Sequence, residues 1–247
     1  MIGNRFKRKA PFEMSRTEER RYEYEKDAYR LFLNRMSDRK PKDLCYLDFM
    51  IDLLRKEVKY SSLLEINRGN TKDRFLYPFH RMCDKLIGAK YTKDFQIDLK
   101  ENNLISAPWD ESRYKGMLKW ISKQGFQYQR SNHMAYYYEY INIACAYNGV
   151  HSLGVGTYFG NGTIKAKSFD TTKIFPYVEA NCDLSFSYNE ENVLRRMEEK
   201  KITMDGYIEQ ELSRRFYGTD YRLILLYKLC QEKYFMERET EENLASF

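Results

Sequence analysis

One segment of this 247-residue chain combines residue types that suit phosphate chemistry. The run Tyr-Asn-Gly-Val-His-Ser, from Tyr147 to Ser152, is predicted to carry the end of a strand into the start of a helix. The first backbone N–H groups of a helix lack partners within it, and the helix dipole favours an anion beside them. Gly149 has no Cβ to hinder an approaching ligand, and His151 is a candidate acid, base or phosphate ligand. We therefore expect a phosphate-containing ligand here, a nucleotide or nucleic acid, with Asn148 and Ser152 as further contacts.

The same segment also has a purely structural interpretation. Asn148 and Gly149 are common turn residues, and Ser152 is a common helix cap. On this interpretation His151 is a packing residue with satisfied hydrogen bonds. The sequence leaves both interpretations open.

A second group of candidates lies earlier in the chain, in the run from Trp109 to Arg113. Asp110 and Arg113 are three residues apart at a predicted helix start, so they can pair or flank a ligand beside the Trp109 ring. Asp110 is the candidate base or metal partner of His151 in a catalytic role. The structural alternative is an acidic residue that complements the helix dipole, next to an anchoring tryptophan.

The histidines raise the question of a metal. His133 lies in a predicted loop and is expected to face His151 as a further ligand contact, whereas His80 lies in a predicted helix with no evident link to either. Two histidines without a third ligand do not form a metal site, so we predict none. The cofactor stays unknown, although Mg²⁺ bound with a nucleotide fits the phosphate hypothesis.

Tyrosine is abundant, at 22 residues, and is concentrated before the candidate site. Four of these rings, in a predicted strand, suit either a stacking platform for bases or the packed surface of a sheet: Tyr136, Tyr137, Tyr138 and Tyr140. Cys145, in the apolar strand that follows, is predicted to be a small buried hydrophobe and not a nucleophile.

The elements that position these residues fall into three regions. Residues 1–95 are predicted to be helical, residues 96–180 form an α/β core, and residues 181–247 are helical again. The core is expected to contain strands at 104–107, 134–140, 141–147 and 163–169, with helices that begin after Asp110 or Ser112 and at 151. The other helices include those expected at 15–36, 44–58, 74–87, 190–201, 207–216 and 221–239. The last of these carries an apolar stripe of Leu225, Leu229 and Met236, which could mediate homo-oligomerisation or bind a protein partner.

Two stretches of the central region resemble the ParB/sulfiredoxin-like domain superfamily. Residues 105–125, with Pro108, Trp109, Arg113 and Ile121, resemble its opening strand, proline and arginine-bearing helix. The run Asn-Gly-Val-His-Ser at 148–152, followed by a small-residue helix and by Asn-Gly-Thr-Ile-Lys at 161–165, resembles its strand, Gly-x-His-Arg box, helix, turn and strand. The flanking helical regions lie outside the resemblance.

The resemblance implies an α+β fold, in which a small mixed-sheet core of this type is flanked by N- and C-terminal helices. It also implies nucleotide-phosphate binding, and NTP hydrolysis or phosphoryl transfer in some branches. Gly149 and His151 match the box, but Ser152 replaces its arginine and Val150 replaces the reactive cysteine of the sulfiredoxin branch. The chain is most similar to an uncharacterised bacterial or phage-borne branch. The alternative is a non-enzymatic nucleic-acid-binding or protein-interaction component of a phage–host conflict system.

Composition narrows the class of protein. The chain is 43% hydrophobic, which predicts a folded protein, and its net charge of +6 permits but does not require a nucleic-acid partner. Five scattered cysteines without a C-x-x-C pair are typical of a reducing compartment. With no signal-peptide pattern at the start and no apolar run long enough to span a bilayer, we expect a cytoplasmic protein that does not contact membranes.

Overall fold

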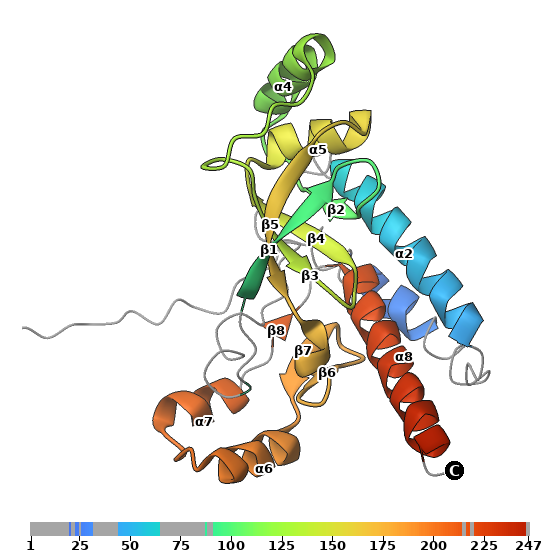
Figure 1. The fold of residues 1–247 in the computed structure, drawn as a ribbon, viewed down its shortest axis with the longest axis vertical. Helices are drawn as coiled ribbons and strands as arrows, with labels where there is room; N and C mark the ends of the chain where they lie inside the picture. Colours follow the sequence, from blue (N-terminus) through green and yellow to red (C-terminus); the bar gives the residue numbers. More distant parts are fainter. Residues whose placement is uncertain are drawn as a thin grey trace, which may run out of the picture.

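The computed structural model describes residues 20, 23–24, 26–31, 44–64, 87, 91–213, 216–217 and 220–245. The described chain is an α+β protein, with a five-stranded mixed sheet and helices around it (Figure 1). The helix expected at 74–87 lies almost entirely outside the described residues, and so does the basic cluster at the start of the sequence. The helix expected at 15–36 is described only in part, at residues between 20 and 31.

The large sheet has the strand order β1-β5-β3-β4-β2. Its strands are β1 (Tyr91–Asp98), β2 (Leu104–Ile105), β3 (Met134–Tyr138), β4 (Ile143–Asn148) and β5 (Thr163–Phe169). Antiparallel pairs join β1 to β5 and β3 to β4, whereas β3 runs parallel to β5 and β2 runs parallel to β4. The β3–β4 hairpin turns at Asn142, which adopts a positive φ of 55° that asparagine tolerates well.

Two helices are stacked on one face of this sheet, one upon the other. α4 (Glu111–Gln124) begins at Asp110, whose side chain accepts a hydrogen bond from the Arg113 N–H, and ends at Gly125. α5 (Val150–Phe159) lies between the sheet and α4, and its residues from His151 to Thr157 are all buried (Figure 1). A compact apolar cluster joins the sheet to α5: Ile97, Leu99, Leu104, Ala135, Tyr137, Ala144, Leu153, Ile164 and Ala166.

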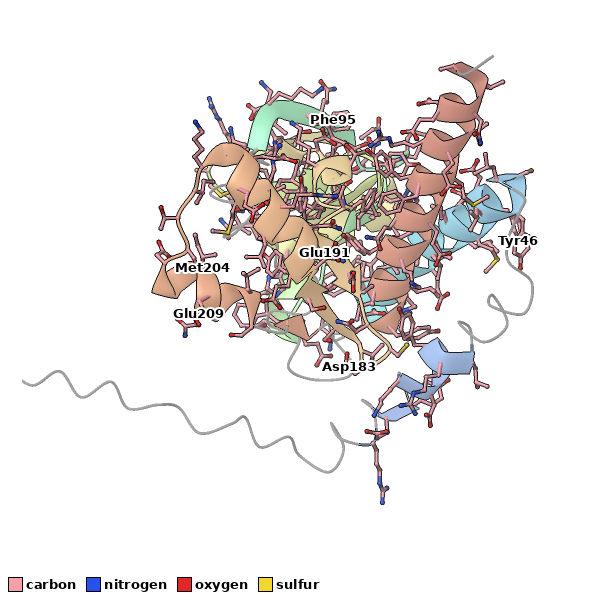
Figure 2. All side chains as sticks on the ribbon, turned by 90° about the horizontal axis from the view of Figure 1, so that it is seen from below. Tyr46, Phe95, Asp183, Glu191, Met204 and Glu209 are labelled. Atoms are coloured by element: carbon pink, nitrogen blue, oxygen red, sulfur yellow. The ribbon has the colours of Figure 1, made fainter. Side chains whose placement is uncertain are left out.

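The opposite face of the sheet packs on the long helices α2 (Leu44–Leu64) and α8 (Tyr221–Ala245), which lie side by side (Figure 1). The outer side of α2 is exposed, and Tyr46 lies at the edge of the molecule in Figure 2. Leu47, Ile105 and Leu225 belong to one buried cluster. The three predicted regions therefore share a core.

Two expectations for the flanking regions are wrong in part. The first region is not helical to its end, because β1 begins at Tyr91. The last region contains strands of a second, three-stranded antiparallel sheet, formed by β6 (Val178–Ala180), β7 (Ser185–Tyr188) and β8 (Phe216–Tyr217). The physical reason is that these strands are short and pair over a long range. β8 pairs with β7, from which it is separated by a stretch of chain about a hundred ångströms long if extended. Local periodicity therefore does not reveal the pairing.

The helix expected at 190–201 is present as α6 (Glu190–Lys200), and the helix expected at 207–216 is present as α7 (Gly206–Leu212) but ends earlier, at Leu212. A short 3₁₀ helix, η3 (Thr171–Lys173), follows β5, and α6 and α7 lie at the end of the molecule opposite α4 (Figure 1).

The expected long C-terminal helix is present as α8, but its apolar stripe does not face outward. Leu225 and Leu229 are each 1% exposed, and Met236 packs against the same core. The stripe is therefore occupied within the chain and is not a surface for assembly.

Candidate functional site

The junction of β4 and α5 has the predicted strand-to-helix form. β4 ends at Asn148, which is exposed, and α5 begins at Val150. Gly149 caps the helix in the left-handed conformation, with φ +68° and no side-chain cap. The first intrahelical hydrogen bond runs from the Leu153 N–H to the Gly149 carbonyl at 2.9 Å. This geometry places the side chains of the first helical turn between two neighbouring loops.

On one side of that turn, His151 contacts the start of α4. Its Nε2 accepts a hydrogen bond from the Asp110 backbone N–H at 3.0 Å, and its ring lies edge-on to Trp109 with 5.3 Å between centroids. The Arg113 guanidinium lies 5.3 Å from the centre of the Trp109 ring, and its Nε is 3.8 Å from Asp110 Oδ2. The four residues that the sequence singled out here do lie together.

On the other side of the same turn, Ser152 bonds to His133. The distance between Ser152 Oγ and His133 Nε2 is 2.8 Å, and the Ser152 hydroxyl donates to the Gly149 carbonyl at 3.0 Å. His133 is in turn held by its own loop, because its Nδ1 accepts a hydrogen bond from the Gln129 N–H at 2.9 Å. The two histidines thus flank the helix start and do not face each other across one cavity.

These hydrogen bonds fix which atoms carry protons. Since Nδ1 of His133 is an acceptor, its ring proton lies on Nε2 and is donated to Ser152 Oγ. The serine proton points to the Gly149 carbonyl and not to the imidazole. The pair is therefore not arranged as a nucleophile and its base, in which the histidine must accept the serine proton.

His151 is constrained in a similar way. Its Nε2 lone pair is occupied by the Asp110 N–H, so the neutral ring offers only an Nδ1–H donor. The Asp110 carboxylate caps α4 through Oδ1, which accepts from the Arg113 N–H at 2.9 Å. In this arrangement His151 and Asp110 lack the free acid–base pair that their proposed catalytic role requires.

Burial keeps both histidines neutral. Desolvation lowers the pKa of His133 below its ordinary value. Desolvation also lowers the pKa of His151; the charge of Asp110 opposes that shift and the charge of Arg113 adds to it. In both rings, protonation would place an N–H group on the nitrogen that now accepts a hydrogen bond from a backbone N–H. The two N–H groups would then face each other, so the fold favours the neutral state.

We expect this preference to make folding stability depend on pH. The pKa values of the two histidines in the folded state lie below the unfolded value of about 6.5. At pH values near and below 6.5, the histidines of the unfolded chain therefore bind more protons than those of the folded chain. The free energy of unfolding should therefore fall as the pH is lowered from 7.5 through 6.5 toward 5.5. The slope should reach about 1.4 kcal/mol per pH unit for each histidine at most.

Urea unfolding at pH 7.5, 6.5 and 5.5 measures this slope. The matched control is the double variant His133→Asn/His151→Asn, whose stability should vary less over the same range. His80 is present in both proteins and cancels in the comparison. An equal slope in the two proteins, or a wild-type protein that gains stability on acidification, would contradict the assignment.

The glycines of the site serve packing. A Cβ on Gly149 would lie 2.7 Å from His133 Cδ2 and 2.8 Å from the Asn132 carbonyl oxygen, so the predicted space for a ligand is filled by the 129–133 loop. A Cβ on Gly156 would lie 2.7 Å from the Phe126 ring. The structural interpretation of these glycines, left open by the sequence, is the one that their surroundings support.

A pocket that sequence reasoning missed adjoins His133, and we call it the basic pocket. It has a volume of about 170 Å³ and lies between the 128–135 segment and strands β1, β4 and β5. Its lining combines cationic and aromatic side chains with one carboxylate: Asp94, Tyr128, Arg130, His133, Met134, Ala135, Tyr147, Lys165, Ala166 and Lys167. His133 lines it, and so does Tyr147 from the predicted run at 147–152.

The signal for this pocket was present in β5. Lys165 and Lys167 alternate with the buried residues Ile164 and Ala166, and period-two alternation places both lysines on one exposed face of a strand. The position of Arg130 near these lysines could not be predicted from residue spacing, because it depends on which strands are neighbours in the sheet.

The predicted tyrosine platform is only partly exposed. Tyr137 and Tyr138 are buried, with 7% and 0% exposure, and belong to the core. Tyr136 is half-buried and stacks on Tyr147, with 4.5 Å between ring centroids. Tyr140 donates a hydrogen bond to Glu237 of α8 at 2.5 Å. Cys145 is fully buried, as expected, and burial raises the pKa of its thiol.

The match to a known family covers all of these site residues. Residues 7–205 match a family of unknown function (DUF6710). The chain belongs to this family. Searches among curated proteins and among solved structures find no match to it. The family region includes both histidine clusters and the basic pocket, whereas α7 and α8 follow it.

Metal ligands do not gather in the described part of the chain. No group of three or more His, Cys, Asp or Glu side chains there is placed to hold a metal ion. Among the helices that the structure describes, none has the length and apolar character needed to cross a bilayer.

Proposed function

We propose that this protein binds a phosphate-bearing ligand, a nucleotide or a nucleic acid, in the basic pocket. The observation that carries the proposal is the lining: Arg130, Lys165 and Lys167 surround an open depression that also presents the rings of Tyr128 and Tyr147. Guanidinium and ammonium groups pair with phosphate oxygens, and aromatic rings offer surfaces for bases. The ligand-binding location thus moves from the start of α5 to the adjoining sheet surface.

The charge at the pocket is positive. The three cationic side chains face a single carboxylate, Asp94, and His133 is held neutral by burial. Asp94 reports this potential directly. Its pKa is lowered, first by the hydrogen bond and charge of Lys167 and further by the charges of Lys165 and Arg130. Asp94 Oδ1 lies 2.9 Å from Lys167 Nζ. An anion that took the place of Asp94 beside Lys167 would be attracted by all three cations.

The core is also proposed to be ParB/sulfiredoxin-like. The order β2, α4, β4, α5 and β5 agrees with the motif order of that superfamily. The position of its phosphate-binding arginine is held by Ser152, which is committed to His133 and Gly149. The positive charge that this arginine would supply comes instead from the basic pocket, where Arg130, Lys165 and Lys167 lie. A role in a phage–host conflict system stays a proposal.

We favour binding over NTP hydrolysis or phosphoryl transfer. Both reactions require groups that position or activate a nucleophile next to the phosphate. The accepting nitrogens of His133 and His151 are already occupied by backbone N–H groups, and Asp110 caps a helix. These three predicted groups are therefore committed to structural hydrogen bonds.

Titration calorimetry with ATP, CTP, ADP and inorganic pyrophosphate tests the proposal. Wild-type protein should bind at least one of them, and Lys165→Gln/Lys167→Gln should weaken binding by about tenfold or more, because each charge-assisted hydrogen bond contributes about 1.5–3 kcal/mol. The matched control is Lys119→Gln/Lys123→Gln, which removes two exposed lysines from α4. An absence of binding, or equal losses in the two double variants, would contradict a phosphate site in this pocket.

A further inference from the structure

In the described part of the chain, α2 and α8 cover one end of the sheet face on which they pack. Ile105, Tyr138, Ile143 and Phe169 belong to the core cluster that includes both helices. Farther along the same face, the side chains are exposed or half-buried: Tyr91, Asp94, Gln96, Met134, Tyr136, Tyr147, Lys165 and Lys167. We call this uncovered part the open sheet face. It continues from the basic pocket, with which it shares most of its residues.

Strand register arranges this face in two rows. Asp94 is paired with Lys167, and Lys167 with Tyr136, across strands β1, β5 and β3. In the neighbouring row Gln96 is paired with Lys165. Because residues two apart on a strand share a face, both lysines of β5 lie on this face, between β1 and β3.

Three tyrosines form a continuous stack beside these lysines. The rings of Tyr91 and Tyr136 are 4.5 Å apart at 28°, and those of Tyr136 and Tyr147 are 4.5 Å apart at 22°. Tyr147 is the most exposed of the three, at 40%, and lines the basic pocket. Tyr128 lies across the pocket and is 37% exposed. Large aromatic rings are thus held at the surface by stacking that fixes their orientation.

The size and openness of the pocket identify the kind of ligand. Pockets that enclose a drug-sized molecule have volumes of about 300–1,000 Å³, and the basic pocket, at about 170 Å³, is too small to enclose a whole nucleotide. It suits part of a ligand that extends over the neighbouring surface. A flat surface with aromatic rings and interspersed cations matches an unpaired strand, whose bases can stack while its phosphates pair with lysine and arginine. Bases within a duplex are already stacked on each other and cannot use such rings.

We propose that the open sheet face, together with the adjoining basic pocket, binds single-stranded nucleic acid. Bases stack on Tyr147 and Tyr128, and phosphates pair with Arg130, Lys165 and Lys167. This inference rests on the proposed phosphate-binding function and adds to it the class of ligand. RNA and DNA share the chemistry that the face recognises, so the experiment includes both.

Fluorescence anisotropy with the full chain tests the inference, using fluorescein-labelled oligo-dT and oligo-U of twelve nucleotides and a duplex of the same length. Both single strands should bind at least tenfold more tightly than the duplex, and their affinity should fall with added salt as counterions are released. Tyr147→Ala should weaken single-strand binding by roughly 5- to 100-fold, because stacking contributes about 1–3 kcal/mol per base. Tyr147→Phe, which keeps the ring, should bind as the wild type does.

Tyr158→Ala is the matched control, since Tyr158 is 64% exposed on α5 and does not line the basic pocket. It should leave binding unchanged. Single strands that bind no more tightly than the duplex, or an equal affinity in Tyr147→Ala and Tyr147→Phe, would overturn the inference. Should Tyr147→Ala fold poorly in thermal melts, Tyr128→Ala against Tyr128→Phe provides the same comparison.

Pyrophosphate separates this inference from the function on which it rests. Its binding should depend on Lys165 and Lys167 but not on the Tyr147 ring. If pyrophosphate binds with that dependence and oligonucleotides bind no more tightly than it does, the single-strand inference fails and the phosphate site stands. If neither pyrophosphate nor oligonucleotides bind, both proposals fail.

Discussion

Replacing Gly149 by alanine is expected to lower the free energy of unfolding by about 2–5 kcal/mol. Two costs combine. A residue with a Cβ at φ +68° pays about 1–2 kcal/mol for the left-handed conformation, and overpacking adds about 1–3 kcal/mol. The overpacking is specific, because the new methyl would lie 2.7 Å from the His133 ring and 2.8 Å from the Asn132 carbonyl oxygen. Neither neighbour yields easily, since His133 bonds to Ser152 and to the Gln129 N–H.

Gly116→Ala is the matched control for this variant. Gly116 lies within α4 and has nothing within 4 Å of an added Cβ, so alanine there should stabilise the protein by about 0.5–1 kcal/mol. Urea unfolding without any ligand measures both changes. A loss of stability in Gly149→Ala supports its role in packing the 129–133 loop. A variant as stable as the wild type, with altered ligand binding alone, would restore the original hypothesis that Gly149 admits a ligand.

Removing the Asp220 carboxylate is expected to be at least as damaging, at about 3–5 kcal/mol. Asp220 is 3% exposed and holds the buried Arg222 with two hydrogen bonds, at 2.8 Å to Nε and 2.5 Å to Nη2. It also accepts the Arg222 backbone N–H at 3.0 Å, near the first turn of α8. Burial opposes the charge on Arg222, but the interactions with Asp220 and Glu57 outweigh it and raise the arginine pKa. Asp220→Ala would leave that charge buried, with Glu57 as its remaining charged partner among the described residues.

Glu57→Ala is the control for the buried pair. Glu57 is 55% exposed in its side chain and lies 3.3 Å from Arg222 Nη1, so its removal should cost less than about 1 kcal/mol. α2 and α8 pack on the large sheet in one core cluster. The melting temperatures of both variants therefore also report on the stability of that helical layer. Equal losses in Asp220→Ala and Glu57→Ala would show that the buried pair contributes no more than a surface contact.

Several features of the site were predictable because they depend on neighbours in the chain. The end of β4 and the start of α5 follow from the run between Tyr147 and Ser152, but the helix cap is Gly149 and not Ser152. Asp110 caps α4 as its residue type favours. The juxtaposition of His151 with Trp109, Asp110 and Arg113 also agrees with expectation. The strand end and the helix cap depend on adjacent residues, whereas the contact of His151 with Asp110 joins residues 41 positions apart.

The orientation of groups around those residues was not predictable. His133 was expected to face His151, but His133 bonds to Ser152 whereas His151 bonds to Asp110, and residues 151 and 152 point about 100° apart around a helix axis. The proton positions that argue against catalysis depend on the Gln129 and Asp110 N–H groups. Those contacts arise from loops that fold back on the site.

The sequence by itself determined the nature of the elements from β2 to β5 and of α8, because hydrophobic periodicity, turn residues and helix caps act over short distances. Only the tertiary structure decided what those elements do. The pairing of β5 with both β1 and β3 brings Lys165 and Lys167 beside the tyrosine stack. The packing of α8 on the core buries the stripe that had suggested assembly. Both outcomes depend on contacts between residues far apart in the chain, whose register no local pattern encodes.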